Sequence, residues 1–212
     1  MHTVIEPRIL YFGTPVVLIS TMNEDGTPNL APMSSAWWLS DSCMLGMGGR
    51  SQTMRNLLRE GECVLNLPDA GLVEAVDRLA LTTGRNPVPD YKARKGYRYE
   101  PDKFGVAGLS PLPADLVRPP RVAECPVNLE AVVTRAHDFG CDDDFLKAVE
   151  VHIVRVHIEE SLVMPDSRHH IDPERWNPLI MNFCEFYGLS EQIHSSRLAK
   201  IFSPQADAVP GR

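Results

Sequence analysis

The sequence has no closely spaced pair of cysteines. Its cysteines are odd in number, lie far apart and form no Cys-x-x-Cys motif: Cys43, Cys63, Cys125, Cys141 and Cys184. Disulfide frameworks use an even set of cysteines, and zinc sites use short ligand spacings, so neither is predicted. A reducing, cytoplasmic location fits this cysteine usage best.

Long apolar runs and an excess of positive charge are also lacking. The apolar run PVVLI at 15–19 is too short for a signal peptide or a membrane span, so we expect no targeting segment and no membrane partner. The formal net charge of −7 disfavours binding to nucleic acid by phosphate neutralisation. No internal repeat is visible, and we expect one domain over residues 1–203 with a flexible tail at 204–212.

The sequence does contain β-rich segments joined by turn signals. Residues 15–21 and 28–38 flank the turn sequence NEDGTP and predict a β-hairpin. Residues 122–137 and 145–160 predict a second, longer hairpin. Because strands dominate, the expected fold is mainly β with short helices, an antiparallel barrel that is closed or partly closed.

Helices are predicted only between strands. Residues 51–61, which end in a glycine, place Met54, Leu57 and Leu58 on one helical face, and residues 71–83 show a second helical pattern. No metal site is predicted. His169 and His170 lie close to Asp166 and Asp172 in the sequence, but these residues have only the composition of a metal site.

Residues 85–104 form a long irregular stretch that we interpret as a loop or lid. It interleaves basic residues with tyrosines: Lys92, Arg94, Lys95, Arg98, Tyr91, Tyr97 and Tyr99. Such a mixture suits single-stranded nucleic acid in other proteins. In an acidic chain we favour a lid whose basic residues meet the phosphates of a nicotinamide donor.

The stretch GMGGRSQTMRN at 46–56 carries the strongest local signal. It nearly matches the dinucleotide fingerprint G-x-G-x-x-G, but a chain that opens with a hairpin does not fit the strand–helix–strand order of a Rossmann fold. Glycines without a Cβ, a helix N-terminus and the side chains of Arg50, Ser51 and Thr53 together suit an anion. The alternative is an ordinary turn with Ser51 as helix N-cap.

The order of these motifs resembles the flavin reductase-like family of FMN-binding split barrels, which is related to the pyridoxamine phosphate oxidases. The resemblance runs from Gly13 to Glu160, with a weaker echo at 176–198, and rests on N-L-A-P-M-S (29–34), R-S-x-T-x-x-N (50–56) and V-L-N-L (64–67). It implies an FMN-binding homodimer with the flavin at the subunit interface. The residues that it implies for cofactor binding are Pro32, Met33, Ser34, Ser35, Ala36, Gly48, Arg50, Ser51, Gln52, Thr53 and Asn56.

Several of these residues suit their implied roles. Pro32 removes a backbone donor, which predicts an edge strand or a bulge where a ligand can lie. Ser34 and Ser35 would point to opposite faces of an extended strand, so only one side chain can face the ring. Asn56 could instead satisfy a neighbouring backbone group. Trp37 and Trp38 are expected to divide between the core and a subunit interface.

The resemblance implies an oxidoreductase, most simply an NAD(P)H:flavin reductase that supplies reduced flavin to a partner monooxygenase or reduces a small acceptor. A non-enzymatic FMN electron carrier and a pyridoxamine phosphate oxidase-like enzyme are the alternatives. FAD could replace FMN. No acid–base residues are predicted, because hydride passes directly between nicotinamide and flavin. Where relatives carry a glycine-containing strand near the flavin, this chain has Glu150-Val151-His152, so contacts there cannot be transferred.

Overall fold

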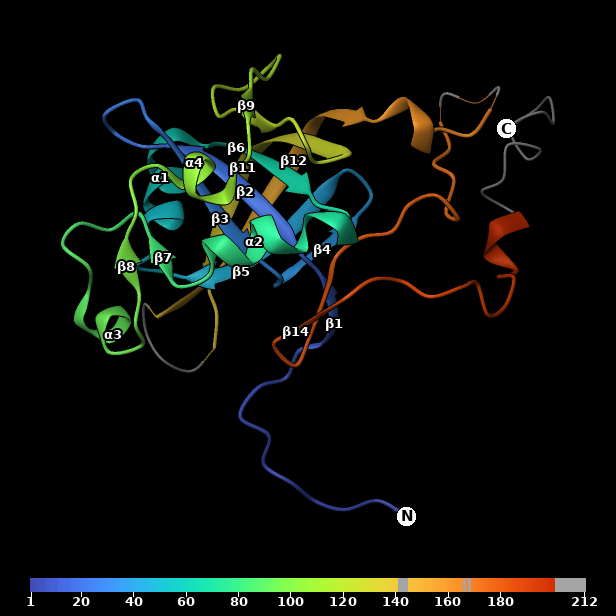
Figure 1. Cartoon of the computed structure of the whole chain (residues 1–212), viewed down its shortest axis with the longest axis horizontal. Coiled ribbons are helices and arrows are strands. Elements are labelled where there is room, and N and C mark those ends of the chain that lie inside the picture. Colours follow the sequence, from blue (N-terminus) through green and yellow to red (C-terminus); the bar gives the residue numbers. More distant parts are fainter. Residues whose placement is uncertain (141–144, 166, 168, 201–212) are drawn as a thin grey trace.

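The structure, a computed structural model, describes residues 1–140, 145–165, 167 and 169–200. Cys141, Asp166 and the predicted tail at 204–212 lie outside these residues. Within the described part, no helix is long and apolar enough to cross a membrane. The chain is mainly β, and short helices pack around a central sheet (Figure 1).

The central sheet has seven strands in the order β3-β2-β6-β11-β12-β5-β4, and each neighbouring pair is antiparallel. The two predicted hairpins are confirmed as β2 with β3 and β11 with β12. The strands are β2 (Val17–Met22), β3 (Pro28–Met33), β4 (Ala36–Leu39), β5 (Ser42–Gly48), β6 (Glu62–Leu67), β11 (Val127–Asp138) and β12 (Leu146–Ile158).

The predicted strand at 28–38 is interrupted at Ser34 and Ser35, which belong to no strand. This short connection leads from one edge of the sheet, β3, directly to the opposite edge, β4. The carbonyl of Ser35 accepts a hydrogen bond of 2.7 Å from Gly46 N–H. A Cβ on Gly46 would lie 3.0 Å from the Cβ of Ser35, so the close approach favours glycine at this position.

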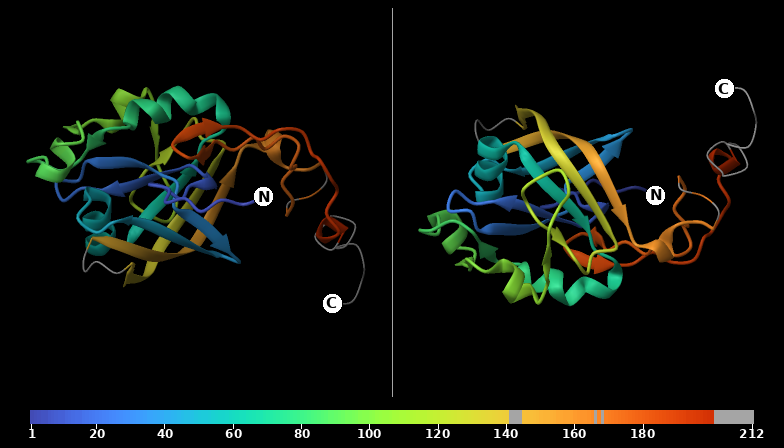
Figure 2. Two further views of the ribbon diagram at one scale, coloured as in Figure 1. Left: turned by 90° about the horizontal axis from the view of Figure 1, so that it is seen from below. Right: turned by 90° about the horizontal axis from the view of Figure 1, so that it is seen from above.

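The connection also shows that the sheet is curled. Seven strands laid flat would span roughly 29 Å between their edges. Met33 and Ala36 end and begin the two edge strands, and three residues of chain reach at most about 11 Å. The sheet must therefore bend round on itself, which confirms the predicted partly closed antiparallel barrel; Figure 2 shows its crossing strands.

The barrel encloses the main core. It includes Ile19, Leu45, Met54, Leu57 and Leu65, each of which is at most 1% exposed. Helix α1 (Gln52–Glu60) contributes Met54 and Leu57 to this core. The prediction that Leu58 shares their face is wrong: its side chain is 61% exposed, because one residue along a helix turns the side chain by about 100°.

A second core lies on the outer face of β2 and β3. It is covered by α2 (Val73–Leu79) and α4 (Lys103–Ala107), which supply Val76, Leu79 and Phe104. The helix predicted at 71–83 begins as the 3-10 turn η1 (Ala70–Leu72) and ends at Leu79, because Ala80 is extended and Leu81 has a φ of +55°.

The remaining short elements lie around the barrel. The predicted loop at 85–104 contains α3 (Asp90–Ala93) and β8 (Arg98–Tyr99) and forms a lobe beside the barrel (Figure 2). The other elements are β1 (Phe12–Pro15), β7 (Thr82–Thr83), β9 (Pro111–Leu112), β10 (Arg121–Val122), η2 (Glu160–Leu162), β13 (Ile180–Asn182), β14 (Glu185–Tyr187) and η3 (Leu198–Lys200).

Candidate functional site

A cavity of about 260 Å³ lies where three parts of the chain meet. The end of β3 forms one wall with Ala31, Pro32 and Met33, and the N-terminus of α1 forms another. The segment that follows α2, residues 80–84, forms the third wall. Side chains of the lobe and of α4 also line this side. The polar and charged side chains that line the cavity include Arg50, Ser51, Gln52, Thr53, Thr82, Thr83, Tyr91, Lys92, Tyr97 and Lys103.

The N-terminus of α1 presents hydrogen-bond donors to this cavity. Ser51 is the N-cap, and its Oγ accepts a bond of 3.1 Å from Met54 N–H. The N–H groups of Gln52 and Thr53 precede the first acceptors that a helix can offer them. The Oγ1 of buried Thr53 accepts a bond of 3.2 Å from Asn29 Nδ2. Both hydroxyls act as acceptors within the protein, so each retains its proton to donate to an anion.

Lys103 is the most unusual group in the cavity. It is the first residue of α4, and it is only 4% exposed, yet no hydrogen bond or ion pair of its ammonium group is found within the described part of the chain. Burial, together with the nearby Lys92, lowers its pKa to about 8, although Glu100 acts in the opposite direction. A buried cation without a partner among the described residues is costly, so the cavity suits a ligand of negative charge.

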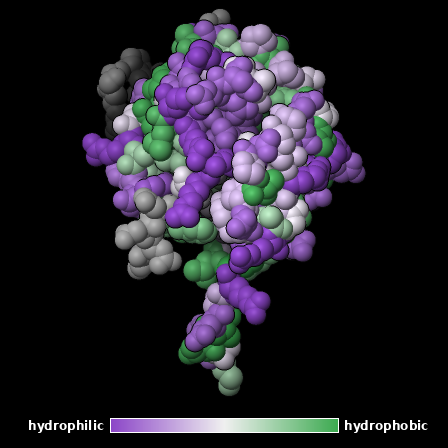
Figure 3. Space-filling model, turned by 90° about the vertical axis from the view of Figure 1, so that its left-hand side faces the viewer, coloured by the Kyte–Doolittle hydropathy of each residue, from purple (hydrophilic) through white to green (hydrophobic). Residues whose placement is uncertain are grey.

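Lys92 extends the positive charge from Lys103 toward the lobe. Its Nζ donates a bond of 3.2 Å to Thr83 Oγ1 and lies 5.2 Å from the centre of the Tyr97 ring. Burial, and secondly Arg85, lower the pKa of Lys92. Figure 3 shows a broad hydrophilic surface on this side of the molecule. Lys92 and Lys103 thus place two positive charges in one cavity of a chain whose net charge is −7.

The structure brings together most, but not all, of the residues proposed from sequence. Those that line the cavity are Pro32, Met33, Gly48, Arg50, Ser51, Gln52 and Thr53. Pro32 lies on an edge strand, as predicted. Ser34 and Ser35 lie on the connection beyond β3 rather than on a strand, so the predicted alternation of their side chains does not apply. Ala36 is buried in the barrel core.

Asn56 supports the site from behind, since it is fully buried and does not line the cavity. Its Nδ2 donates bonds of 3.0 Å to Thr21 Oγ1 and to Asn23 Oδ1, while its Oδ1 accepts a bond of 2.9 Å from Gln52 Nε2. These bonds use the polar atoms of Asn56 within the protein. The partners of Asn56 are thus side chains, and not the neighbouring backbone group that the alternative prediction named, and they give Asn56 a structural role.

Sequence reasoning missed Lys103, Thr83 and Gly84. A Cβ on Gly84 would lie 2.8 Å from Asn29 Oδ1 and 3.0 Å from Gln52 Cγ, so this glycine lets the segment after α2 pack against the first turn of α1. Lys103 is about 50 residues from the Arg-Ser-x-Thr motif in the sequence. No local pattern marks it, although Asp102 before it is a typical N-cap, whose Oδ1 accepts a bond of 2.8 Å from Gly105 N–H.

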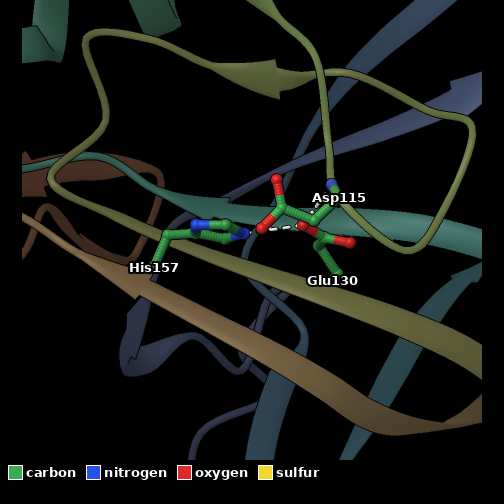
Figure 4. Close-up of side chains that lie close together, drawn as sticks. All are labelled: Asp115, Glu130 and His157. Atoms are coloured by element: carbon green, nitrogen blue, oxygen red, sulfur yellow. Dashed lines mark hydrogen bonds and ion pairs between the residues drawn. The ribbon is translucent and has the colours of Figure 1, made fainter.

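A second polar cluster joins β11, β12 and the loop after β9 (Figure 4). Asp115, Glu130 and His157 bring ligand atoms within 4.8 Å of one another, a spacing that could hold a metal. Fully buried Glu130, however, already accepts bonds from His157 Nε2 (2.6 Å), Asp115 N–H (2.8 Å) and Leu116 N–H (2.6 Å). These bonds explain the cluster as an anchor for the loop.

Comparison with known proteins points to one family. The family described as "Flavin reductase like domain" matches residues 9–172. The Bacillus subtilis protein YdfE is 39% identical over 189 residues, which cover 89% of this chain and 90% of YdfE.

Solved structures show a similar fold. Flavoredoxin of Desulfovibrio vulgaris aligns with a TM-score of 0.77 at 22% identity, over 94% of this chain and all of that one. Nitrilotriacetate monooxygenase component B from Bacillus cereus aligns with a TM-score of 0.71 at 22% identity, over 87% of this chain and 88% of that chain. At such identities these likenesses concern the fold.

Proposed function

The chain belongs to the flavin reductase-like domain family, and from this membership and the cavity's chemistry we propose that it is an FMN-dependent oxidoreductase. A bound flavin would supply a redox centre that accepts hydride from NADH or NADPH. The protein's part is to bind the nucleotide, orient its ring and exclude water. No acid–base residue is required of the chain for this direct transfer.

The observation that carries the proposal is that Lys103 and the N-terminus of α1 line the same cavity. A phosphate between them would receive bonds from the hydroxyls of Ser51 and Thr53 and would neutralise the buried ammonium group. Arg50, at the mouth of the same cavity, can add a bidentate contact. The donor set therefore fits a phosphate group.

The flavin ring would extend from the phosphate along the end of β3, past Pro32 and Met33. We assign Ser34, Ser35 and Ala36 to the same side of the site through backbone contacts. A second copy of the chain would complete it: Trp37 and Leu39 on the edge strand β4 are 57% and 72% exposed, a pair of large apolar side chains suited to a homodimer interface. Trp38, between them, packs against the core.

Two uses of reduced flavin follow from the relatives. Component B of nitrilotriacetate monooxygenase is named as part of a monooxygenase, so this chain could supply reduced flavin to an oxygenase partner. Flavoredoxin is named as a redox protein, which matches the alternative of an electron carrier. The two uses differ in whether a nicotinamide nucleotide reduces the bound flavin rapidly.

Anaerobic stopped-flow mixing of the FMN-loaded full chain with NADH, and separately with NADPH, distinguishes them. The reductase proposal predicts rapid loss of the visible flavin absorbance with at least one donor. If neither donor bleaches a flavin that dithionite does reduce, the reductase proposal fails and the carrier is favoured. If the full chain binds no FMN, both fail.

A further inference from the structure

A second cavity of about 520 Å³ lies next to the first, between α1 and the lobe. Four arginines line it: Arg50, Arg55, Arg85 and Arg94. Asp90 is the one carboxylate among its described lining residues. Such a ratio of charges in one cavity is unusual in a chain that carries 28 acidic and 21 basic residues.

These arginines are not engaged elsewhere. For none of their guanidinium groups is an ion pair or a hydrogen bond found among residues that the structure describes. Burial lowers the pKa of Arg85, and so, secondly, does the neighbouring Arg55. Among the described lining residues, four guanidinium groups thus share the cavity with a single carboxylate, that of Asp90, an arrangement that favours a bound anion.

The positively charged lining of the second cavity extends into the first cavity. Arg50 and Tyr91 line both cavities. Lys92 lies between the two groups of charges. Arg85 of the second cavity lowers the pKa of Lys92, and Lys92 in turn lowers the pKa of Lys103 in the first cavity. A ligand that places one phosphate at the N-terminus of α1 therefore has a second phosphate-binding region directly beside it.

We propose that the cavity formed by Arg50, Arg55, Arg85 and Arg94 is a second phosphate site, which binds a phosphate of the adenylate half of a dinucleotide. This inference rests on the proposed flavin function. Tyr91 would support the nucleotide from the side: its ring lies 6.0 Å from that of Phe145 at an interplanar angle of 67°, an edge contact that holds its orientation. Guanidinium groups bind phosphate oxygens bidentately.

FAD, NADH and NADPH carry this chemistry, since each has an adenylate phosphate. FAD has a second phosphate attached to the flavin phosphate, and NADPH has a 2′-phosphate on its adenosine. Either would place an adenylate phosphate among the arginines, with different consequences. The first would make FAD the preferred flavin, and the second would make NADPH the preferred donor.

Calorimetric titration of the FMN-loaded full chain with adenosine, ADP and adenosine 2′,5′-bisphosphate tests the site without turnover. Arg94→Gln removes a guanidinium from an exposed position, where the fold does not depend on it. Arg98→Gln is the matched control, because Arg98 is exposed on β8 in the same lobe and does not line the cavity. We expect at least one phosphorylated probe to bind at least about tenfold more tightly than adenosine, and Arg94→Gln to weaken it about tenfold.

Each outcome has a separate meaning. Preference for ADP identifies a site for the 5′-diphosphate, which FAD and both nicotinamide donors carry, and preference for the 2′,5′-bisphosphate identifies a site for the 2′-phosphate of NADPH. The proposal is overturned if adenosine binds as tightly as both phosphorylated probes, or if Arg94→Gln and Arg98→Gln have equal effects. Binding of a single-stranded oligonucleotide without a response to either probe also overturns it. If FMN does not bind, the proposed function fails, while the same titrations on the flavin-free chain still decide the phosphate site.

Discussion

Replacing Lys103 by methionine should weaken FMN binding and stabilise the flavin-free protein. The two effects have opposite signs because the ammonium group is buried without a partner until a phosphate arrives. Methionine has a similar length and no charge, so it fills the same space. Lys95→Met is the control, since Lys95 is an exposed lysine of the same lobe that does not line either cavity.

The effect on stability follows from the pKa of Lys103, which lies near 8 instead of 10.5. A difference of this size corresponds to about 3 kcal/mol against the charged form. Because the folded state holds this proton less tightly than the unfolded state, the full penalty is present below pH 8 and disappears as pH rises to 10.5. Lys103→Met should therefore raise the free energy of unfolding by up to about 3 kcal/mol at pH 7, a gain that vanishes near pH 10.5.

The effect on binding follows from the lost charged contact. Hydrogen bonds to charged groups contribute about 1.5–3 kcal/mol, so the Kd for FMN should rise about 10- to 100-fold. Urea unfolding of the flavin-free chain at several pH values and fluorescence titration with FMN measure the two effects. The reasoning is refuted if Lys103→Met binds FMN within about twofold of the wild type, or if it gains no more stability than Lys95→Met.

Two further substitutions test other parts of the structure. Ser51→Ala removes the N-cap bond from Met54 N–H, so it should lower the free energy of unfolding by about 1 kcal/mol and weaken FMN binding. Ser51→Thr should restore stability and binding in the same titrations. An alanine variant that loses neither would contradict the role of Ser51 as N-cap and phosphate ligand. In Glu130, burial opposes ionisation, but hydrogen bonds from Asp115 N–H, His157 and Leu116 N–H prevail and hold its pKa below its ordinary value. Its contribution to stability is therefore present above the unfolded pKa and is lost as pH falls through the folded value. Glu130→Gln should destabilise the chain by about 2–4 kcal/mol at pH 7 and flatten the acid limb of the stability profile, whereas an unchanged acid limb would exclude this anchoring role.

The fold could be predicted from sequence where the pattern is local. The β-rich apolar run at 15–21 and the turn at 23–28 specify the first hairpin, and the serine and glycine at the two ends of α1 specify that helix. The break at Ser34 and Ser35 could not be predicted, because it depends on closure of the barrel rather than on the propensity of either residue. The sequence leaves open which side of the stripe formed by Met54, Leu57 and Leu58 faces the core, and the packing of α1 buries Met54 and Leu57 and exposes Leu58.

The candidate site divides in the same way. The motif at 50–53 is contiguous, so its chemistry can be recognised before the fold is known. Lys103 belongs to a different element, and only the packing of α4 over the second core carries it into the cavity. The direction of the Asn56 side chain could not be predicted from the sequence. Its hydrogen bonds to Thr21 and Asn23 hold it within the protein.

We propose above that this chain binds a flavin nucleotide by its phosphate, between the N-terminus of α1 and Lys103. Comparison of FMN with riboflavin, which lacks the phosphate, tests it most directly. Fluorescence titration of the flavin-free full chain should give a Kd for FMN at least about 100-fold lower than that for riboflavin, since several charge-assisted bonds are lost together. Equal dissociation constants for the two flavins would contradict the account.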